Sequence, residues 1–189
     1  RAALTAGHAR DVDLWPSDGH LNDPTRAPVP AAVLIAVTDR ALPGIILTQR
    51  PETMRNHAGQ IAFPGGRVDP EDAGIVAAAL REAHEEIALA PHLVHVIGET
   101  DTYSTITGFA VTPVIGVVPP DVAYRASVGE VDAIFEVPLA FLLDPANHRV
   151  QALEHEGRKR QFFEITWRER RIWGATAAML VNLSRRLAW

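Results

Sequence analysis

Three glutamates lie within one short stretch, at positions 82, 85 and 86, where the apolar residues recur with the period of a helix. At about 100° per residue, Glu82, Glu85 and Glu86 share one face of that helix. Like charges three and four residues apart destabilise a helix by roughly 0.2–0.5 kcal/mol per pair. Carboxylate oxygens are also the ligands that Mg²⁺ and Mn²⁺ prefer. The cluster therefore predicts either a solvated acidic helix face or a site for divalent cations.

Two adjacent glycines, Gly65 and Gly66, follow Pro64 upstream of this helix. Glycine has no Cβ, so the backbone at such a turn can approach a ligand or an ion closely. Asp72 lies between the turn and the helix and is a candidate N-cap. Arg81 stands four residues before Glu85, a spacing that allows an ion pair. The glycine turn next to the acidic cluster favours the cation site over the solvated face.

The composition is that of an ordinary globular protein and narrows the partners. The chain has 189 residues, 47% of them hydrophobic and 22% charged, and a formal net charge of −5. A mildly acidic protein is a poor candidate for binding nucleic acid or membranes, so we expect a small-molecule partner. There is no cysteine, which leaves oxygen and imidazole as metal ligands and fits a cytoplasmic location.

The pattern of apolar runs and turns predicts an α/β (α+β) protein with a mixed sheet flanked by helices. We expect residues 31–189 to form one domain, and residues 1–30 to form an N-terminal extension packed on it. Helices are expected at 73–87, 139–143 and, as a closing amphipathic helix, 175–187. Strands are expected at 33–38, 45–48, 94–97, 111–118 and 133–137, with a hairpin formed by 150–154 and 162–167.

The glycine turn and the acidic helix together resemble the Nudix box, the signature of the Nudix hydrolases. Its pattern is Gly, five residues, Glu, seven residues, Arg-Glu, an aliphatic, any residue, Glu-Glu, any residue, Gly and an aliphatic. The matching positions are Gly66, Arg81, Glu82, Glu85, Glu86 and Leu89. The departures are Asp72 in place of Glu, eight residues before Arg81 instead of seven, Ala83 for the aliphatic and Ala88 for the second Gly.

A second motif, upstream of the box, resembles the coenzyme A pyrophosphatase branch of that family. The branch pattern is Leu-Leu-Thr-x-Arg-Ser/Ala, three residues, Arg, three residues, Gly, three residues and Phe-Pro-Gly-Gly. Residues 46–66 follow it, with Ile46 for the first Leu and Pro51 for Ser/Ala. The branch also tends to carry the longer box with Asp, so the departures at Asp72 and before Arg81 favour the branch.

The resemblance implies a Nudix fold, with a mixed β-sheet sandwiched between α-helices, and hydrolysis of a diphosphate with Mg²⁺ or Mn²⁺. For the branch, the substrate is coenzyme A, cut to 3′-phospho-AMP (3′,5′-ADP) and 4′-phosphopantetheine. It implies Glu82 and Glu86 as principal metal ligands, and Glu85 as ligand of a further ion or as the base. The carbonyl of Gly66 is a further candidate ligand, and Glu130 a second candidate base.

Arg50, Arg55 and Arg67 bracket the glycine turn and are candidates for binding the substrate's phosphates, since a planar guanidinium suits phosphate oxygens. Solvated loop charge is the alternative for each of them. Two other functions stay open. One is a Nudix pyrophosphatase for ADP-ribose, NADH or another nucleoside diphosphate derivative, and the other is a non-catalytic binding module with the same fold.

Overall fold

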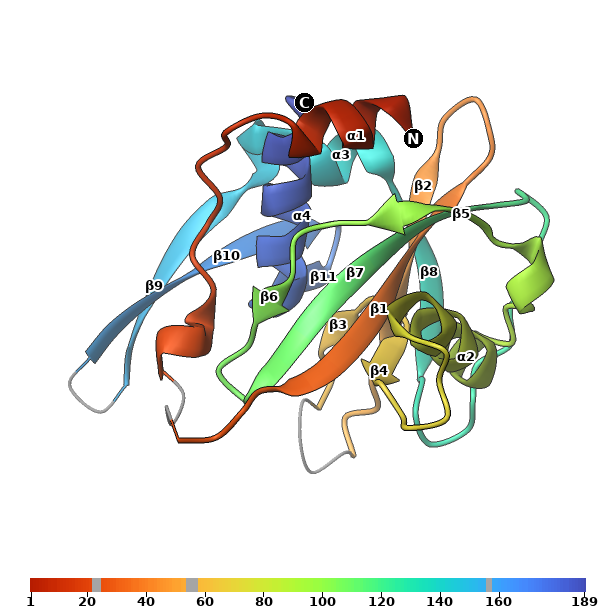
Figure 1. Ribbon diagram of the computed structural model, residues 1–189, viewed down its shortest axis with the longest axis horizontal. Coiled ribbons are helices and arrows are strands. Elements are labelled where there is room, and N and C mark those ends of the chain that lie inside the picture. The colour runs from red at the N-terminus through yellow and green to blue at the C-terminus, as the bar shows by residue number, and fades with distance from the viewer. Residues whose placement is uncertain (22–24, 54–57, 156–157) are drawn as a thin grey trace.

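The computed structural model describes residues 1–21, 25–53, 58–155 and 158–189 (Figure 1). Its helices are α1 (Ala2–His8), α2 (Ile75–Ile87), α3 (Leu139–Leu143) and α4 (Ala175–Leu187), with short 3₁₀ turns η1 (Asp18–Leu21), η2 (Pro91–Leu93) and η3 (Pro145–Asn147). Its strands are β1 (Val29–Thr38), β2 (Gly44–Gln49), β3 (Ile61–Ala62), β4 (Gly65–Arg67), β5 (His95–Glu99), β6 (Tyr103–Ser104), β7 (Phe109–Val118), β8 (Ala133–Pro138), β9 (Arg149–His155), β10 (Arg158–Trp167) and β11 (Arg170–Trp173).

The larger sheet is mixed, as the sequence predicts. Its main path runs β3-β2-β1-β7-β5, and β4, β6 and β8 pair with β1, β7 and β2 respectively. Strands β1 and β7 are parallel along their whole length, from Val29 opposite Phe109 to Thr38 opposite Val118. The other pairings in this sheet are antiparallel. The predicted α/β (α+β) fold class is confirmed, with helices on both faces of the sheet (Figure 1).

Strand β1 shows why the sheet is sandwiched. Its residues Ala32, Leu34 and Ala36 face α2 and belong to the smaller of two hydrophobic clusters. The alternate residues Ala31 and Ile35 belong to the larger cluster, with α3, α4 and β10. Because successive side chains of a strand point to opposite faces, a strand covered on both sides must be apolar throughout. The run 31–37 meets that requirement and forms the centre of the sheet.

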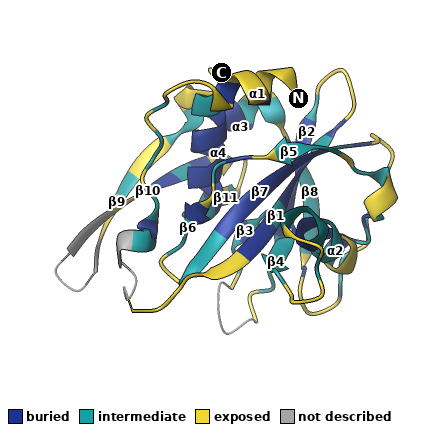
Figure 2. Ribbon diagram, in the orientation of Figure 1, coloured by how far each residue is buried: buried dark blue, intermediate teal, exposed yellow. Residues whose placement is uncertain are grey.

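The C-terminal part differs from the prediction in two ways. The expected hairpin is present, but β11 joins it to form a separate sheet of order β11-β10-β9. The predicted closing helix is present as α4 with the predicted bounds, but it has no solvent-exposed face over residues 176 to 184, which are all buried (Figure 2). Helix α4 lies between this second sheet and α1 and α3, so both its apolar and its polar faces are covered.

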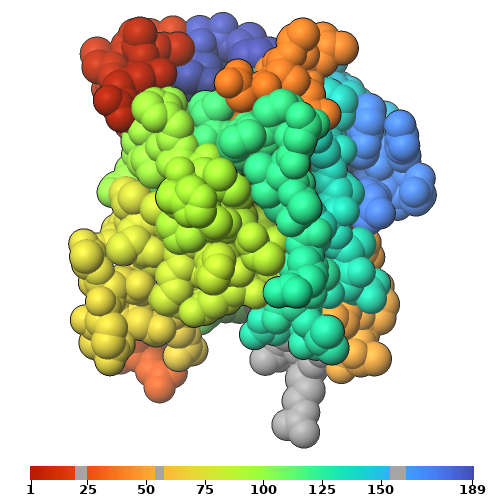
Figure 3. Space-filling model, turned by 90° about the vertical axis from the view of Figure 1, so that its right-hand side faces the viewer, coloured from red at the N-terminus to blue at the C-terminus, as the bar shows by residue number. Residues whose placement is uncertain are grey.

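The N-terminal segment packs on this buried helix. Helix α1 contacts α4, and the chain ends meet at the same side of the molecule in Figures 1 and 3. Leu4 is buried in the larger cluster, and Gly7 lies against the main chain of Arg186 so closely that a Cβ would overlap it. In the described part of the chain, no helix is long and apolar enough to cross a membrane.

Candidate functional site

Strand β4 brings the two glycines into contact with the acidic helix. It pairs with β1, Val33 opposite Gly65 and Ala32 opposite Gly66, and α2 packs against both strands. A Cβ on Gly66 would lie 2.5 Å from Oε1 of Glu82, so glycine is what allows that carboxylate to lie against the backbone. The predicted closeness of the turn and the cluster is thus present at Gly66 and Glu82.

Glu86 is the most enclosed carboxylate of the cluster. Its Oε2 accepts a hydrogen bond of 3.2 Å from the backbone N–H of Gly65. Burial raises the pKa of Glu86 to about 7, and repulsion from Glu82 and Glu130 adds to that rise, while Gly65 and Arg50 oppose it. Burial also raises the pKa of Glu82, against the effect of its hydrogen bond to Arg81. Both shifts mean that a nearby positive charge would stabilise the ionised carboxylates.

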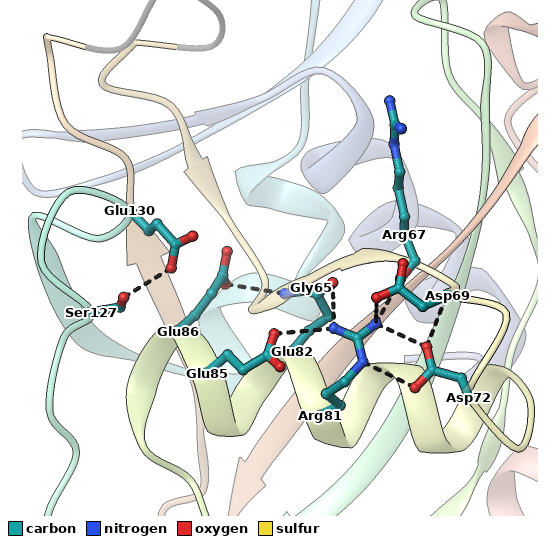
Figure 4. A network of polar contacts seen from close by, with 10 residues as sticks. All are labelled: Gly65, Arg67, Asp69, Asp72, Arg81, Glu82, Glu85, Glu86, Ser127 and Glu130. Atoms are coloured by element: carbon teal, nitrogen blue, oxygen red, sulfur yellow. Dashed lines mark hydrogen bonds and ion pairs between the residues drawn. The ribbon is translucent and has the colours of Figure 1, made fainter.

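Arg81 is the centre of the polar network in Figure 4. Its guanidinium makes two hydrogen bonds to Asp72, of 3.0 and 2.8 Å, and one to the backbone carbonyl of Arg67. It also donates to Glu82 at 3.0 Å and to Glu85 at 3.1 Å, which confirms the predicted ion pair of Arg81 with Glu85. The bonds to Asp72 raise the pKa of Arg81, so it stays charged. Arg81 therefore fixes two of the three glutamates relative to the glycine turn.

The prediction of Asp72 as the helix N-cap is wrong. Helix α2 begins at Ile75 and its N-cap is Gly74, with no capping side chain. The carboxylate of Asp72 binds Arg81 instead, and this pairing lowers the pKa of Asp72. Asp72 therefore holds Arg81, two turns into the helix, and does not cap the N-terminus of α2.

The carboxylates do not converge on one point in this structure. Within the described residues, no three His, Asp or Glu side chains are grouped so that they could hold a metal ion by themselves. Glu82 and Glu85 are turned towards Arg81, and Glu86 towards Gly65 (Figure 4). The candidate metal ligands are nevertheless all oxygens. The raised pKa values of Glu82 and Glu86 also mean that a cation placed beside these carboxylates would stabilise their ionised form. Such a set fits Mg²⁺ or Mn²⁺, which take few carboxylates and complete their shell with phosphate and water.

Glu130 is brought to this site by a loop that is fastened to the end of α2. The N–H of Ser127 donates to the carbonyl of Glu86 at 2.8 Å, and that of Arg125 to Ile87 at 3.0 Å. The hydroxyl of Ser127 donates to Glu130 Oε2 at 2.9 Å. The segment after β7 lies directly beside α2 on the face in Figure 3, and Glu130 stands near Glu86 in Figure 4. Ser127 thus links the two glutamates, and nothing in the sequence had singled it out.

A cavity of about 740 Å³ opens beside the glycine turn. Arg50, Gly65, Gly66 and Arg67 line it, so two of the three arginines predicted to bind phosphate lie at one cavity. Arg67 is exposed, and its guanidinium lies 5.4 Å from the centre of the Phe109 ring. Arg55, the third, lies outside the described residues.

Sequence reasoning missed the wall of this cavity formed by β7 and the turn before it. Thr105, Thr107 and Phe109 line that wall, and Thr176 at the start of α4 lines the cavity as well. The hydroxyl of Thr105 accepts from the N–H of Phe109 at 3.1 Å and lies 2.9 Å from that of Thr107. The pattern Thr-x-Thr-Gly-Phe marks a turn, but the turn faces the glycine turn only through the parallel pairing of β1 and β7.

Comparison with known proteins decides the family. The family model described as the NUDIX domain matches residues 28–165, which is most of the chain. The chain belongs to the Nudix family. The Shigella boydii protein named "Uncharacterized Nudix hydrolase NudL" is 47% identical over 155 residues, which cover 82% of this chain and 80% of that protein. The protein of the same name from Escherichia coli O1:K1 is 46% identical over the same shares.

Solved structures agree with the family in fold. The C. elegans Ap4A hydrolase in a binary complex superposes with a TM-score of 0.50 at 20% identity, covering 58% of this chain and 80% of that one. The M. smegmatis Nudix hydrolase RenU gives 0.51 at 21% identity, covering 60% and 73%. The Nudix fold predicted from the box is therefore confirmed. This chain is a Nudix hydrolase of diphosphate-containing substrates, a class that generally uses divalent metal ions.

Proposed function

We propose that this Nudix protein is a coenzyme A diphosphatase, which cleaves coenzyme A to 3′-phospho-AMP and 4′-phosphopantetheine with Mg²⁺ or Mn²⁺. One observation carries the proposal. The motif that resembles the coenzyme A branch starts in β2 and ends in β4, and its residues Arg50, Gly65 and Gly66 line the same cavity, as does Arg67 directly after it. Gly66 at that cavity also touches Glu82, so the branch motif and the acidic helix meet at one point.

Glu82 and Glu86 would hold the divalent cation, with the carbonyl of Gly66 as a further ligand, and Glu85 would bind a second ion or act as a base. When bound, such a cation offsets the charge of the diphosphate oxygens and makes a water molecule more acidic. The burial that raises the pKa of Glu86 to about 7 is consistent with a group that is ionised next to a cation. Arg81 keeps Glu82 and Glu85 in place through its bonds to both.

The remaining charged groups have roles that follow from where they stand. Arg50 and Arg67 at the cavity would bind the phosphates, because the planar guanidinium can donate two parallel hydrogen bonds to phosphate oxygens. Arg55 keeps the same role as a proposal from the sequence. Glu130, held by Ser127 beside Glu86, would take the proton from the attacking water, with Glu85 as the other candidate.

A substrate panel tests the proposal. Purified protein is incubated with coenzyme A, ADP-ribose and NADH side by side, with Mg²⁺ or Mn²⁺, and the products are identified by mass. We expect coenzyme A to be hydrolysed with the highest kcat/KM and to give the two named products. The matched control is Glu99→Gln in β5, an exposed glutamate outside the cavity, which should behave as wild type.

Two results would contradict the proposal. A higher kcat/KM for ADP-ribose or NADH would make this protein another kind of Nudix pyrophosphatase. If Glu82→Gln hydrolysed coenzyme A as fast as wild type, the metal assignment of Glu82 would be lost. If wild type hydrolysed none of the three substrates, a binding module would become the better explanation.

A further inference from the structure

The segment before the family's domain packs against β6, the strand that leads into one wall of the substrate cavity. The match to the family begins at residue 28, so residues 11–19, here called the N-terminal strap, lie outside it. The strap crosses α4, where the side chain of Asn182 bonds to both the N–H and the carbonyl of Trp15, at 2.7 and 3.3 Å. At its far end, Arg185 donates to the carbonyl of Asp13 at 2.7 Å.

The other end of the strap is fixed to β6 by a buried acid. Asp18 Oδ2 accepts a hydrogen bond of 3.1 Å from the hydroxyl of Tyr103, and the two residues expose only 8% and 3% of their surface. Next to them Gly19 packs against Ser104, since a Cβ there would lie 2.7 Å from the Cβ of Ser104. An aspartate is rarely this buried unless it is paired, and the hydroxyl of Tyr103 is one of the partners of Asp18.

Strand β6 leads directly into the wall of the cavity. Tyr103 stands opposite Val111 and Ser104 opposite Ala110, and Val111 lines the cavity. The turn that follows carries Thr105 and Thr107, which also line it. Because β6 has only two residues, its pairing with β7 gives it little rigidity of its own. The contacts of Asp18 and Gly19 therefore hold the turn against the cavity from the outer side.

We propose that the N-terminal strap is a positioning element of the substrate cavity. Asp18, acting through Tyr103, fixes the β6–β7 turn, so that a segment outside the family's domain sets how tightly the substrate is bound. This rests on the proposed function only in taking the cavity as the substrate site. The diphosphate chemistry on the α2 side of the glycine turn does not depend on the strap.

Isosteric variants test the proposal. Tyr103→Phe removes only the hydroxyl, and Asp18→Ala removes the acceptor, while Asp18→Asn keeps an oxygen that can accept the same bond. We expect Tyr103→Phe and Asp18→Ala to raise KM for coenzyme A by roughly fivefold with kcat within about twofold of wild type, because they loosen binding and leave the carboxylates in place. Asp18→Asn should keep the KM of wild type.

The control is Arg185→Ala, which releases the strap at Asp13, the end away from the cavity. It should leave KM unchanged even if it lowers the melting temperature. The proposal is overturned if Tyr103→Phe and Asp18→Ala leave KM unchanged, or if Arg185→Ala raises KM as much as they do. Equilibrium binding of coenzyme A and of ADP-ribose in metal-free buffer is measured in parallel by calorimetry. If wild type binds coenzyme A in this buffer but does not hydrolyse it once Mg²⁺ or Mn²⁺ is added, the proposed function alone is refuted, and weaker binding by Tyr103→Phe would still support the strap.

Discussion

Helices α2 and α4 have the same length and the same kinds of ends, but they differ in how far their residues are buried. Each has 13 residues, begins after a glycine with positive φ and no capping side chain, and ends at an alanine in the left-handed conformation. In α4 the residues from 176 to 184 are all buried. In α2 only Ala78, Ala79, Ala83 and Ile87 are buried, and the other side carries the glutamates.

The difference lies in how the polar side chains are satisfied. In α4, Thr176 donates to the carbonyl of Ile61, Ser184 to that of Leu143, and Asn182 binds Trp15, so its buried polar residues hold neighbouring segments. In α2, Glu82 and Glu86 are partly buried with raised pKa values, a state that opposes their ionisation. Polar groups that lower stability where they stand are typical of functional sites, whereas fully paired ones are typical of structural positions.

The largest effect is expected for Glu86→Gln, which tests whether the buried carboxylates of α2 serve function and not stability. Glutamine stays neutral in a place where burial disfavours the charge, so we expect the melting temperature at pH 8 to be unchanged or higher. Hydrolysis of the preferred diphosphate should fall by about 100-fold or more, because the proposed role of Glu86 as a cation ligand requires a carboxylate. Thermal unfolding and turnover are measured on the same preparation. A variant that is less stable and fully active would mean that Glu86 is structural.

Ser127→Ala tests whether the loop attached to α2 orients Glu130 for catalysis. The variant removes the hydroxyl that donates to Glu130 and keeps the backbone bond to Glu86. We expect kcat to fall by about tenfold with KM unchanged, less than the effect of Glu130→Gln, because the carboxylate remains but loses its orientation. Ser127→Thr keeps the hydroxyl and should restore most of the rate. If Glu130→Gln has no effect on kcat, the base is Glu85 or another group.

Ser184→Ala makes the opposite test in α4. It removes the donor of a buried 2.6 Å hydrogen bond to Leu143, which should lower the free energy of unfolding by about 1 kcal/mol. Urea denaturation measures that loss, and kcat and KM of the folded protein should match wild type. A change in kcat without a loss of stability would show that α4 takes part in the chemistry.

The sequence predicted the central strands, α2 and the glycine turn, because their periodicity and spacing are local signals. The sequence did not predict features that depend on how distant segments pack together. The pattern that suggested an amphipathic α4 could not reveal that β3, α3 and the N-terminal strap supply hydrogen-bond partners to its polar residues. The role of Asp72 was missed because its partner, Arg81, is nine residues away and reached only across the first turns of α2. The threonine wall depends on the pairing of β1 with β7, which no local pattern encodes.

The smallest expected effect concerns the ends of the two helices. Ala88 replaces the second glycine of the box and adopts φ 56, a left-handed conformation that disfavours any residue with a Cβ. We expect Ala88→Gly to raise the free energy of unfolding by up to about 1 kcal/mol, since glycine is the usual residue at this position of a helix end. Ala188→Gly, at φ 53, should give less, because Ala188 is exposed and packing constrains its backbone less than that of the half-buried Ala88. Urea midpoints at constant m-value measure both, and a destabilised Ala88→Gly would mean that the methyl group of Ala88 packs more favourably than its backbone is strained.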